Sequence, residues 1–94
     1  MISIVVPVFN EEESLDAFYK ELSLVIPDLD KNYEIIFVDD GSKDKSLDIL
    51  KGLSSKNKNV KIFSFRKNQG KSEALTYGFE KSSGDYIVTL DADL

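Results

Sequence analysis

The stretch that decides the fold is Tyr33-Glu34-Ile35-Ile36-Phe37-Val38-Asp39-Asp40-Gly41-Ser42. It is a short, almost continuous apolar run that ends in two acids, a glycine and a serine. Apolar residues on both faces are typical of a strand in a parallel sheet that helices cover on both sides. The first apolar run, Ile2–Val6, has the same character. We therefore expect two buried, neighbouring strands of this kind.

The rest of the chain repeats the same alternation of short apolar runs and amphipathic stretches. Two further runs, Val60–Phe65 and Asp85–Leu90, predict two more strands. Apolar residues at helical spacing predict three intervening helices, at Ser14–Ile26, roughly Lys45–Ser55 and roughly Gly70–Ser82. The order βαβαβαβ with short links predicts right-handed crossovers and a doubly wound, Rossmann-like α/β fold with a mainly parallel sheet.

Two local signals follow the first strand. We expect Pro7 to end that strand, because proline cannot donate a hydrogen bond to a neighbouring strand. Asn10 is expected to cap the first helix, with Glu13 reaching back in a capping box.

Composition limits the classes of function. The 94 residues fit one compact domain, and the absence of cysteine excludes disulfides and thiolate metal sites. The absence of histidine excludes an imidazole base, an imidazole ligand and a Ser-His-Asp triad. A formal net charge of −5 disfavours nucleic acid as a partner. The start of the chain has no basic leader and its apolar run is too short to span a membrane, so we expect a cytoplasmic protein.

The polar clusters all follow predicted strands. In open α/β sheets, ligands bind beyond the carboxyl ends of the strands, so these clusters should meet along one edge. They are Pro7-Val8-Phe9-Asn10-Glu11, Asp39-Asp40-Gly41-Ser42, Arg66-Lys67-Asn68-Gln69-Gly70-Lys71 and Asp91-Ala92-Asp93.

Asp91 and Asp93 are candidate metal ligands. Residues two apart in an extended chain point to the same side, so both carboxylates can face one cation. Carboxylate oxygens suit Mg²⁺ or Mn²⁺, which complete their coordination with water and substrate phosphate. The alternative is an Asp-rich turn that caps a following helix.

Asp39 and Asp40 are adjacent acids at the end of a strand, where they repel each other unless they are solvated or paired. A carboxylate in this place can accept a hydrogen bond from a nucleotide base or a ribose hydroxyl. The alternative is a turn in which Gly41 adopts a positive φ and Ser42 or Asp44 caps the next helix.

Two further segments are candidates for ligand contact. Pro7, Phe9 and Glu11 lie where the chain turns across the ligand edge. Gly70 permits close approach of the backbone at a helix N-terminus, which favours an anion, and Lys71 adds a positive charge. An ordinary loop is the alternative for both segments.

The electrostatics of this edge point to a metal ion. A diphosphate requires positive charge, yet the edge gathers five acids and has no Gly-rich phosphate loop. Each close pair of like charges costs on the order of 1 kcal/mol even in water. A divalent cation held by the carboxylates reverses the sign of the field, so we expect diphosphate binding to depend on a metal. The five acids are Glu11, Asp39, Asp40, Asp91 and Asp93.

In order and spacing, five segments resemble the family 2 glycosyltransferases of the GT-A fold, over essentially the whole chain. Within that family the pattern is similar to polyprenyl- and dolichyl-phosphate sugar transferases. The segments are Val6–Glu11, Val38–Ser42, Asn68–Lys71 with Ala74 and Gly78, Gly84-Asp85, and Asp91–Leu94.

The resemblance implies an inverting, metal-dependent transfer of a sugar from a nucleoside diphosphate sugar, such as a UDP- or GDP-sugar. The acceptor would be a polyprenyl phosphate or a saccharide. Asp39 would contact the base, Lys71 would approach the base or the phosphates, and Asp91 would lie near the ribose. The residues implied in donor binding are Pro7, Phe9, Glu11, Asp39, Asp40, Lys71 and Asp91, and those implied in holding Mg²⁺ or Mn²⁺ are Asp91 and Asp93.

The resemblance also implies that residues 1–94 are the truncated N-terminal, nucleotide-sugar-binding part of a GT-A domain. Later segments would supply the acceptor site, any catalytic base and any membrane association, so we expect these residues alone to be inactive.

Two alternative functions make different demands on the sequence. A receiver-like signalling module needs its paired acids after the first strand and a phosphoacceptor aspartate after the third. A sugar nucleotidyltransferase needs a basic, Gly-rich loop after the first strand.

Overall fold

The computed structural model describes residues 1–29 and 32–93, so Leu94 at the end of the family-like segment lies outside the described residues. Helices and strands alternate in the predicted order, which confirms the type of every element. They are β1 (Ile2–Val8), α1 (Leu15–Leu29), β2 (Tyr33–Asp39), α2 (Ser46–Lys56), β3 (Val60–Ser64), α3 (Lys71–Lys81) and β4 (Tyr86–Thr89).

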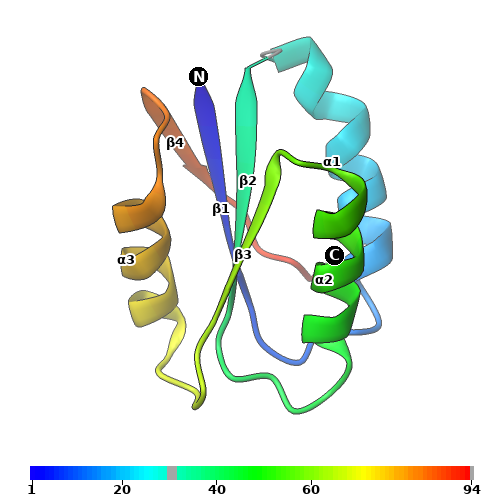
Figure 1. Ribbon diagram of the computed structural model, residues 1–94, viewed down its shortest axis with the longest axis vertical. Coiled ribbons are helices and arrows are strands. Elements are labelled where there is room, and N and C mark those ends of the chain that lie inside the picture. The colour runs from blue at the N-terminus through cyan, green and yellow to red at the C-terminus, as the bar shows by residue number, and fades with distance from the viewer. Residues whose placement is uncertain (30–31, 94) are drawn as a thin grey trace.

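The strands form one parallel sheet in the order β3-β2-β1-β4. Helices α1 and α2 cover one face of this sheet and α3 covers the other (Figure 1). The prediction of a doubly wound, parallel α/β fold is confirmed. The loops that follow β1, β2 and β3 lie together at the lower end of the sheet in Figure 1.

The two central strands explain why their sequences are continuously apolar. On β2, Phe37 faces α1, where its ring meets that of Phe18 edge to face at 6.4 Å between centroids. Its neighbours Ile36 and Val38 face α3, where they pack with Ala74. Because helices cover both faces, every β2 residue after Tyr33 is buried.

The edge strand β4 differs from the central strands. All four of its residues are exposed, and Tyr86 retains 72% of its accessible surface. It pairs with β1 along Ile2 to Val5. No helix in residues 1–29 and 32–93 is long and apolar enough to cross a lipid bilayer.

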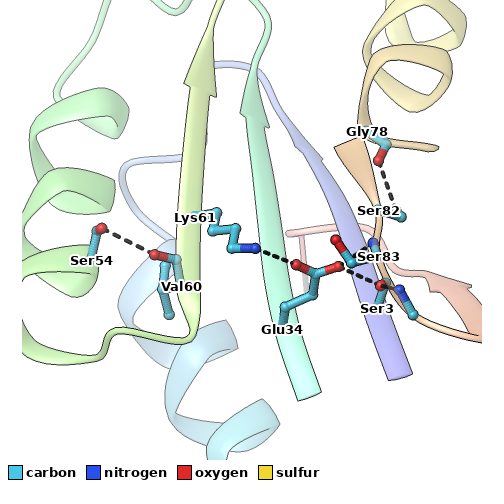
Figure 2. Close-up of polar contacts among 9 residues, drawn as sticks. Ser3, Glu34, Ser54, Val60, Lys61, Gly78, Ser82 and Ser83 are labelled. Carbon is cyan, nitrogen blue, oxygen red and sulfur yellow. Dashed lines mark hydrogen bonds and ion pairs between the residues drawn. The ribbon is translucent and has the colours of Figure 1, made fainter. Parts of the chain in front are cut away.

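A buried acid joins the strands at the end of the sheet where they begin (Figure 2). Glu34 of β2 is 3% exposed and accepts hydrogen bonds from the Ser3 hydroxyl at 2.6 Å, the Lys61 ammonium at 2.7 Å and the Ser83 backbone N–H at 2.6 Å. Burial raises the pKa of Glu34, but hydrogen bonds from Lys61, Ser3 and Ser83 outweigh it and leave the pKa below its ordinary value. The network ties β3, β1 and the connection before β4 to β2.

The prediction that Pro7 ends the first strand is wrong, because β1 continues to Val8 with Pro7 opposite Val38. Backbone groups alternate in direction along a strand. The Val8 carbonyl accepts from Asp40 on the β2 side, and the Val5 carbonyl accepts from Leu90 on the β4 side. Pro7 therefore faces the β4 side, beyond the last pairing of β4, where the missing N–H removes no hydrogen bond from the sheet.

The predicted capping box at α1 is also wrong. Asn10 lies in a turn at a φ of 52°, and its side-chain oxygen accepts a hydrogen bond from the Lys43 N–H at 2.9 Å. The carbonyl of Glu11 accepts the N–H groups of Ser14 and Leu15 instead. Asn10 thus joins two loops at the ligand edge, a tertiary contact that the local spacing does not reveal.

Candidate functional site

A cleft of about 470 Å³ lies at the carboxyl ends of the strands. It is lined by Pro7, Val8, Phe9, Glu11, Asp40, Asn68, Gly70, Lys71, Asp91, Ala92 and Asp93. The structure thus brings together all of the predicted site residues except Asp39. The polar strand ends therefore lie along one edge of the sheet, as expected, and they bring together residues as distant in sequence as Pro7 and Asp93.

The first wall of the cleft is the loop after β1, which contributes Phe9 and Glu11. Phe9 remains 44% exposed, so much of its ring is available to a ligand. Glu11 is fixed by its backbone N–H, which donates to the Ser46 hydroxyl at 2.8 Å. The neighbouring Asn10 N–H donates to the Ser42 hydroxyl at 2.9 Å. Contacts to the β2–α2 loop and to the start of α2 therefore hold this wall in place.

Asp40 organises the second wall. Its carboxylate is 3% exposed and accepts three hydrogen bonds from one loop: the Gln69 N–H at 2.6 Å, the Gly70 N–H at 3.0 Å and the Asn68 amide at 2.8 Å. These neutral donors satisfy the buried carboxylate, as a buried polar group requires. Asp40 therefore fixes the loop from which α3 begins.

Gly41 makes this arrangement sterically feasible. It adopts a φ of +71°, as predicted for the turn after β2. A Cβ atom built on it would lie 2.5 Å from the Asn68 nitrogen and 2.6 Å from the Lys67 carbonyl carbon. The loop packs directly against the bare Cα, so only glycine fits here. The N-cap residue of α2 is Lys45, so the expectation that Ser42 or Asp44 caps this helix is wrong. Asp44 precedes the cap, and its carboxylate accepts the N–H of Ser46, the first residue of α2.

Asp39 lies next to the cleft-lining Asp40 but is not itself among the lining residues. It is 1% exposed, and its Oδ2 accepts the Ser42 N–H at 3.3 Å and the Ser64 hydroxyl at 3.4 Å. Its Oδ1 is buried and has no hydrogen-bond partner within the part of the chain that the structure describes. An unsatisfied buried acceptor of this kind costs about 1–3 kcal/mol.

The third wall is the segment after β4. Asp91 and Asp93 are exposed whereas Ala92 between them is 3% exposed. The carbonyl of Ala92 accepts the Ser14 hydroxyl at 3.1 Å, which anchors the segment to the start of α1. Both acids line the same cleft, as expected for residues two apart in an extended chain.

Lys71 lies against the third wall. Its ammonium is 2.6 Å from Asp91 Oδ1, and both side chains are more than half exposed. The hydrogen bond and charge of Asp91, with the charge of Asp93 adding to them, raise the pKa of Lys71. Both carboxylates therefore act on one cation position.

The donor set fits a divalent cation that is shared with a ligand. Asp91 and Asp93 offer oxygen atoms that solvent can reach, and they already attract the positive charge of Lys71. Across residues 1–29 and 32–93, no three or more acids converge as a metal cage. Mg²⁺ and related ions commonly use one or two carboxylates and take their remaining ligands from water and substrate phosphates. The two acids fit that pattern.

The sequence reasoning did not single out four of the lining residues as site residues. Asn68 and Gly70 belong to a segment that was recognised, and the glycine at a helix start was the available signal. Val8 and Ala92 are apolar and carry no chemical signal of their own. They line the cleft because their neighbours in sequence do.

Comparison with known proteins identifies the family of this chain. The family model described as "Glycosyl transferase family 2" matches residues 3–94. The glycosyltransferase YkcC of Bacillus subtilis is 46% identical over 92 residues, which cover 98% of this chain and 28% of the relative. The undecaprenyl-phosphate 4-deoxy-4-formamido-L-arabinose transferase of Pseudomonas fluorescens is 42% identical over 94 residues, which cover 99% of this chain and 28% of the relative.

A solved structure shares the fold. Glucosyl-3-phosphoglycerate synthase of Mycobacterium tuberculosis, determined with Mn²⁺, UDP and phosphoglyceric acid, superimposes with a TM-score of 0.76 at 29% identity. The match covers 100% of this chain and 33% of that chain. This chain spans about 28% of the length of the two relatives named above. The matches decide against a receiver module and a sugar nucleotidyltransferase. The chain belongs to glycosyl transferase family 2.

Proposed function

We propose that this chain forms the donor-binding part of a glycosyltransferase that takes a sugar from a UDP- or GDP-sugar in the presence of Mg²⁺ or Mn²⁺. The observation that carries the proposal is the convergence of Lys71, Asp91 and Asp93 on one cleft at the carboxyl edge of the sheet. This edge is where α/β folds bind nucleotides. Its acidic character requires a bridging cation before a diphosphate can bind.

Each wall of the cleft takes one part of the donor. Phe9, with Pro7 and Glu11, faces the nucleoside from the β1 side. The unpaired oxygen of Asp39 is buried beside the cleft-lining Asp40, so it would accept a hydrogen bond from a base N–H once the surrounding side chains shift. That bond would remove the cost of leaving a buried acceptor unsatisfied. Asp40 contributes indirectly, because its oxygens are occupied by the loop from Asn68 to Gly70.

Asp91 and Asp93 would hold the metal, and Asp91 would also lie near the ribose. When bound, the cation supplies charge neutralisation and Lewis-acid stabilisation of the departing diphosphate. The acceptor oxygen attacks the anomeric carbon from the opposite face, the bond from that carbon to the diphosphate oxygen breaks, and the configuration inverts. Lys71 contributes a further positive charge beside the diphosphate.

The acceptor is a lipid phosphate of the polyprenyl type. This part of the proposal is supported by relatives named as undecaprenyl-phosphate sugar transferases, such as the Pseudomonas fluorescens protein. A phosphate oxygen is already anionic, so it needs little help from a base. Because the chain spans about 28% of those relatives, other parts of a longer protein would supply the acceptor site and association with the cytoplasmic face of the membrane.

Calorimetric titration of the protein with UDP and with GDP, each with and without Mn²⁺, tests the proposal. We expect binding of at least one nucleotide that requires Mn²⁺ and weakens about tenfold or more in D91N and D93N, because each loses a charged ligand. D48N, which removes an exposed acid from α2, is the control and should bind normally. Failure of the folded protein to bind either nucleotide with Mn²⁺ would refute the proposal.

A further inference from the structure

We infer that Lys71 is an exchangeable cation: it neutralises Asp91 when the cleft holds no donor, yields Asp91 to the divalent metal, and transfers to the diphosphate. The inference rests on the proposed function and deepens it, because it assigns Lys71 two successive partners in the same site. Three features of the structure carry the argument.

The first feature is a fixed backbone beneath Lys71. The two residues before it donate their N–H groups to the buried Asp40 carboxylate at 2.6 and 3.0 Å. One turn later, Ala74 is fully buried against the sheet and donates to the Gly70 carbonyl. The Cα of Lys71 is therefore held between two anchors, and only its side chain is able to change position.

The second feature is the freedom of that side chain. Lys71 is 61% exposed at the side chain, and its ammonium is held by Asp91 Oδ1, itself on a side chain that is 58% exposed. Ion pairs between exposed side chains contribute little because water and salt screen them. Lys71 also has a flexible four-carbon stem with three rotatable N–H donors. Breaking the ion pair with Asp91 therefore costs little free energy, and the exposed Lys71 ammonium is able to change its position.

The third feature is competition for one oxygen atom. The Lys71 ammonium lies 2.6 Å from Asp91 Oδ1, which is a hydrogen-bonding distance. A bond from the same oxygen to a metal ion would replace this hydrogen bond. A divalent cation and an ammonium on the same carboxylate repel each other strongly at this range. The Lys71 ammonium would therefore leave Asp91 if that carboxylate held a divalent cation.

A new partner for the displaced ammonium lies within reach. The same cleft is lined by Gly70 and Lys71 at the N-terminus of the 11-residue helix α3, where the helix dipole favours anions. A diphosphate bridged to Asp91 and Asp93 through the metal would place its oxygens between this helix and the acids. The ammonium then exchanges a carboxylate for a phosphate without leaving the cleft.

The exchange predicts two opposite effects of one substitution. In K71M a metal ion no longer competes with an ammonium for Asp91, so Mn²⁺ alone should bind about threefold to tenfold more tightly. UDP or GDP with Mn²⁺ should bind about tenfold more weakly, because a charge-assisted hydrogen bond to the diphosphate is lost. K58M is the control of equal charge. Lys58 lies in the turn before β3, near the opposite end of the sheet from the cleft, and K58M should change neither affinity by more than about twofold.

A structural readout separates exchange from a general effect of charge. Reductive methylation with ¹³C labels the lysines, and the Lys71 signal is assigned by its loss in K71R. We expect this signal to shift when Asp91 is replaced in D91N, to shift on adding Mg²⁺ alone, and to shift to a third position on adding Mg²⁺ with UDP or GDP. The methylated protein must retain nucleotide binding, which the titration of the proposed function measures.

The outcomes distinguish this inference from the proposed function. If the unsubstituted protein binds neither Mn²⁺ nor a nucleotide, both fall together. Suppose instead that it binds both. The exchange alone is then overturned if K71M has the same affinities as K58M, or if the Lys71 signal does not shift on addition of Mg²⁺. The exchange is established if K71M binds Mn²⁺ more tightly and the nucleotide more weakly, and if the Lys71 signal has three positions: without ligand, with Mg²⁺, and with Mg²⁺ and nucleotide.

Discussion

The Asp40 carboxylate accepts the backbone N–H of Gln69 at 2.6 Å, which ties the end of β2 to the loop that precedes α3. The Gly70 N–H and the Asn68 amide complete the set of donors. D40N places an NH₂ group against one of these donors. We expect the free energy of unfolding to fall by about 2 kcal/mol, because hydrogen bonds to a buried charge are lost. Nucleotide binding should weaken as well, since this loop leads directly into Lys71, the first residue of α3.

Urea denaturation and calorimetry measure these two effects, with D48N on the surface of α2 as the control. An unchanged denaturation midpoint in D40N would contradict the bracing role assigned to Asp40.

Gly41 provides a sharper test of the same contact. A Cβ there would meet backbone atoms of Lys67 and Asn68 at 2.6 Å or less, and the φ of +71° disfavours any L side chain. We expect G41A to lower the free energy of unfolding by about 2–3 kcal/mol, from backbone strain and overpacking together. G52A is the matched control, because nothing lies within 4 Å of that Cβ position. Alanine in the middle of α2 should stabilise the protein by about 0.5–1 kcal/mol.

Thermal or urea denaturation of the two variants gives the comparison. Equal and small effects of G41A and G52A would show that the loop is able to yield at Gly41.

The elements were predictable because their signals are local. The run from Tyr33 to Val38 is apolar on both faces and therefore belongs inside a covered sheet, and the other elements follow from the same kind of pattern. The convergence of strand ends followed from the topology rule alone. The sequence was therefore sufficient for the parallel character of the sheet and for the place of the cleft, but not for the strand order β3-β2-β1-β4.

The contacts inside the cleft were not predictable, because they depend on register between distant segments. The ion pair between the Lys71 ammonium and Asp91, 20 positions later in the chain, has no signal in the sequence. Asp40 was treated as a ligand residue, while its oxygens are taken by Gln69 and Gly70. The prediction that Pro7 ends the first strand was wrong, because the side to which the Pro7 backbone points depends on how β4 pairs with β1 in the assembled sheet.

Glu34 should make stability depend on pH in the acidic range. Its folded-state pKa lies below the ordinary value of 4.5, so its stabilising effect is fully present above about pH 4.5 and is lost as the pH falls through the folded-state pKa. We expect E34Q to lower the free energy of unfolding at neutral pH by about 2 kcal/mol, because the buried hydrogen bond from Lys61 loses its charged acceptor.

The difference in unfolding free energy between E34Q and the unsubstituted protein should shrink as the pH is lowered from 7 to 3 in urea titrations. E80Q, on the exposed side of α3, is the control for a changed net charge. A difference that stays constant over this range would show that Glu34 does not titrate in the folded protein as its contacts imply.

Substitution of Asp39 should leave stability almost unchanged, whereas substitution of its neighbour Asp40 should lower it. D39N keeps an amide oxygen for the Ser42 N–H but presents an NH₂ group where the unpaired carboxylate oxygen lies. We expect stability to change by less than about 1 kcal/mol, because no satisfied buried bond is lost. Nucleotide affinity should fall about tenfold, because a donor would then face the base N–H. Normal nucleotide affinity in D39N would remove the base contact from the proposed site.

The Ser14 hydroxyl anchors the segment that carries Asp91 and Asp93, the proposed metal ligands. It lies 3.1 Å from the carbonyl of Ala92, the residue between the two candidate ligands, and Ala92 is buried beside it. S14A removes the contact of Ser14 with this segment, and also its contact with the Glu11 carboxylate at 3.1 Å, but it leaves Asp91 and Asp93 unchanged. We expect Mn²⁺ affinity to fall about threefold to tenfold, the size of one lost hydrogen bond, because Asp91 and Asp93 would no longer be held in one arrangement. S23A is the matched control, since the Ser23 hydroxyl donates to the Tyr19 carbonyl within α1, away from the segment that follows β4. Titration with Mn²⁺ measures both variants, and equal affinities in S14A and S23A would mean that the acids hold their positions without the anchor on α1.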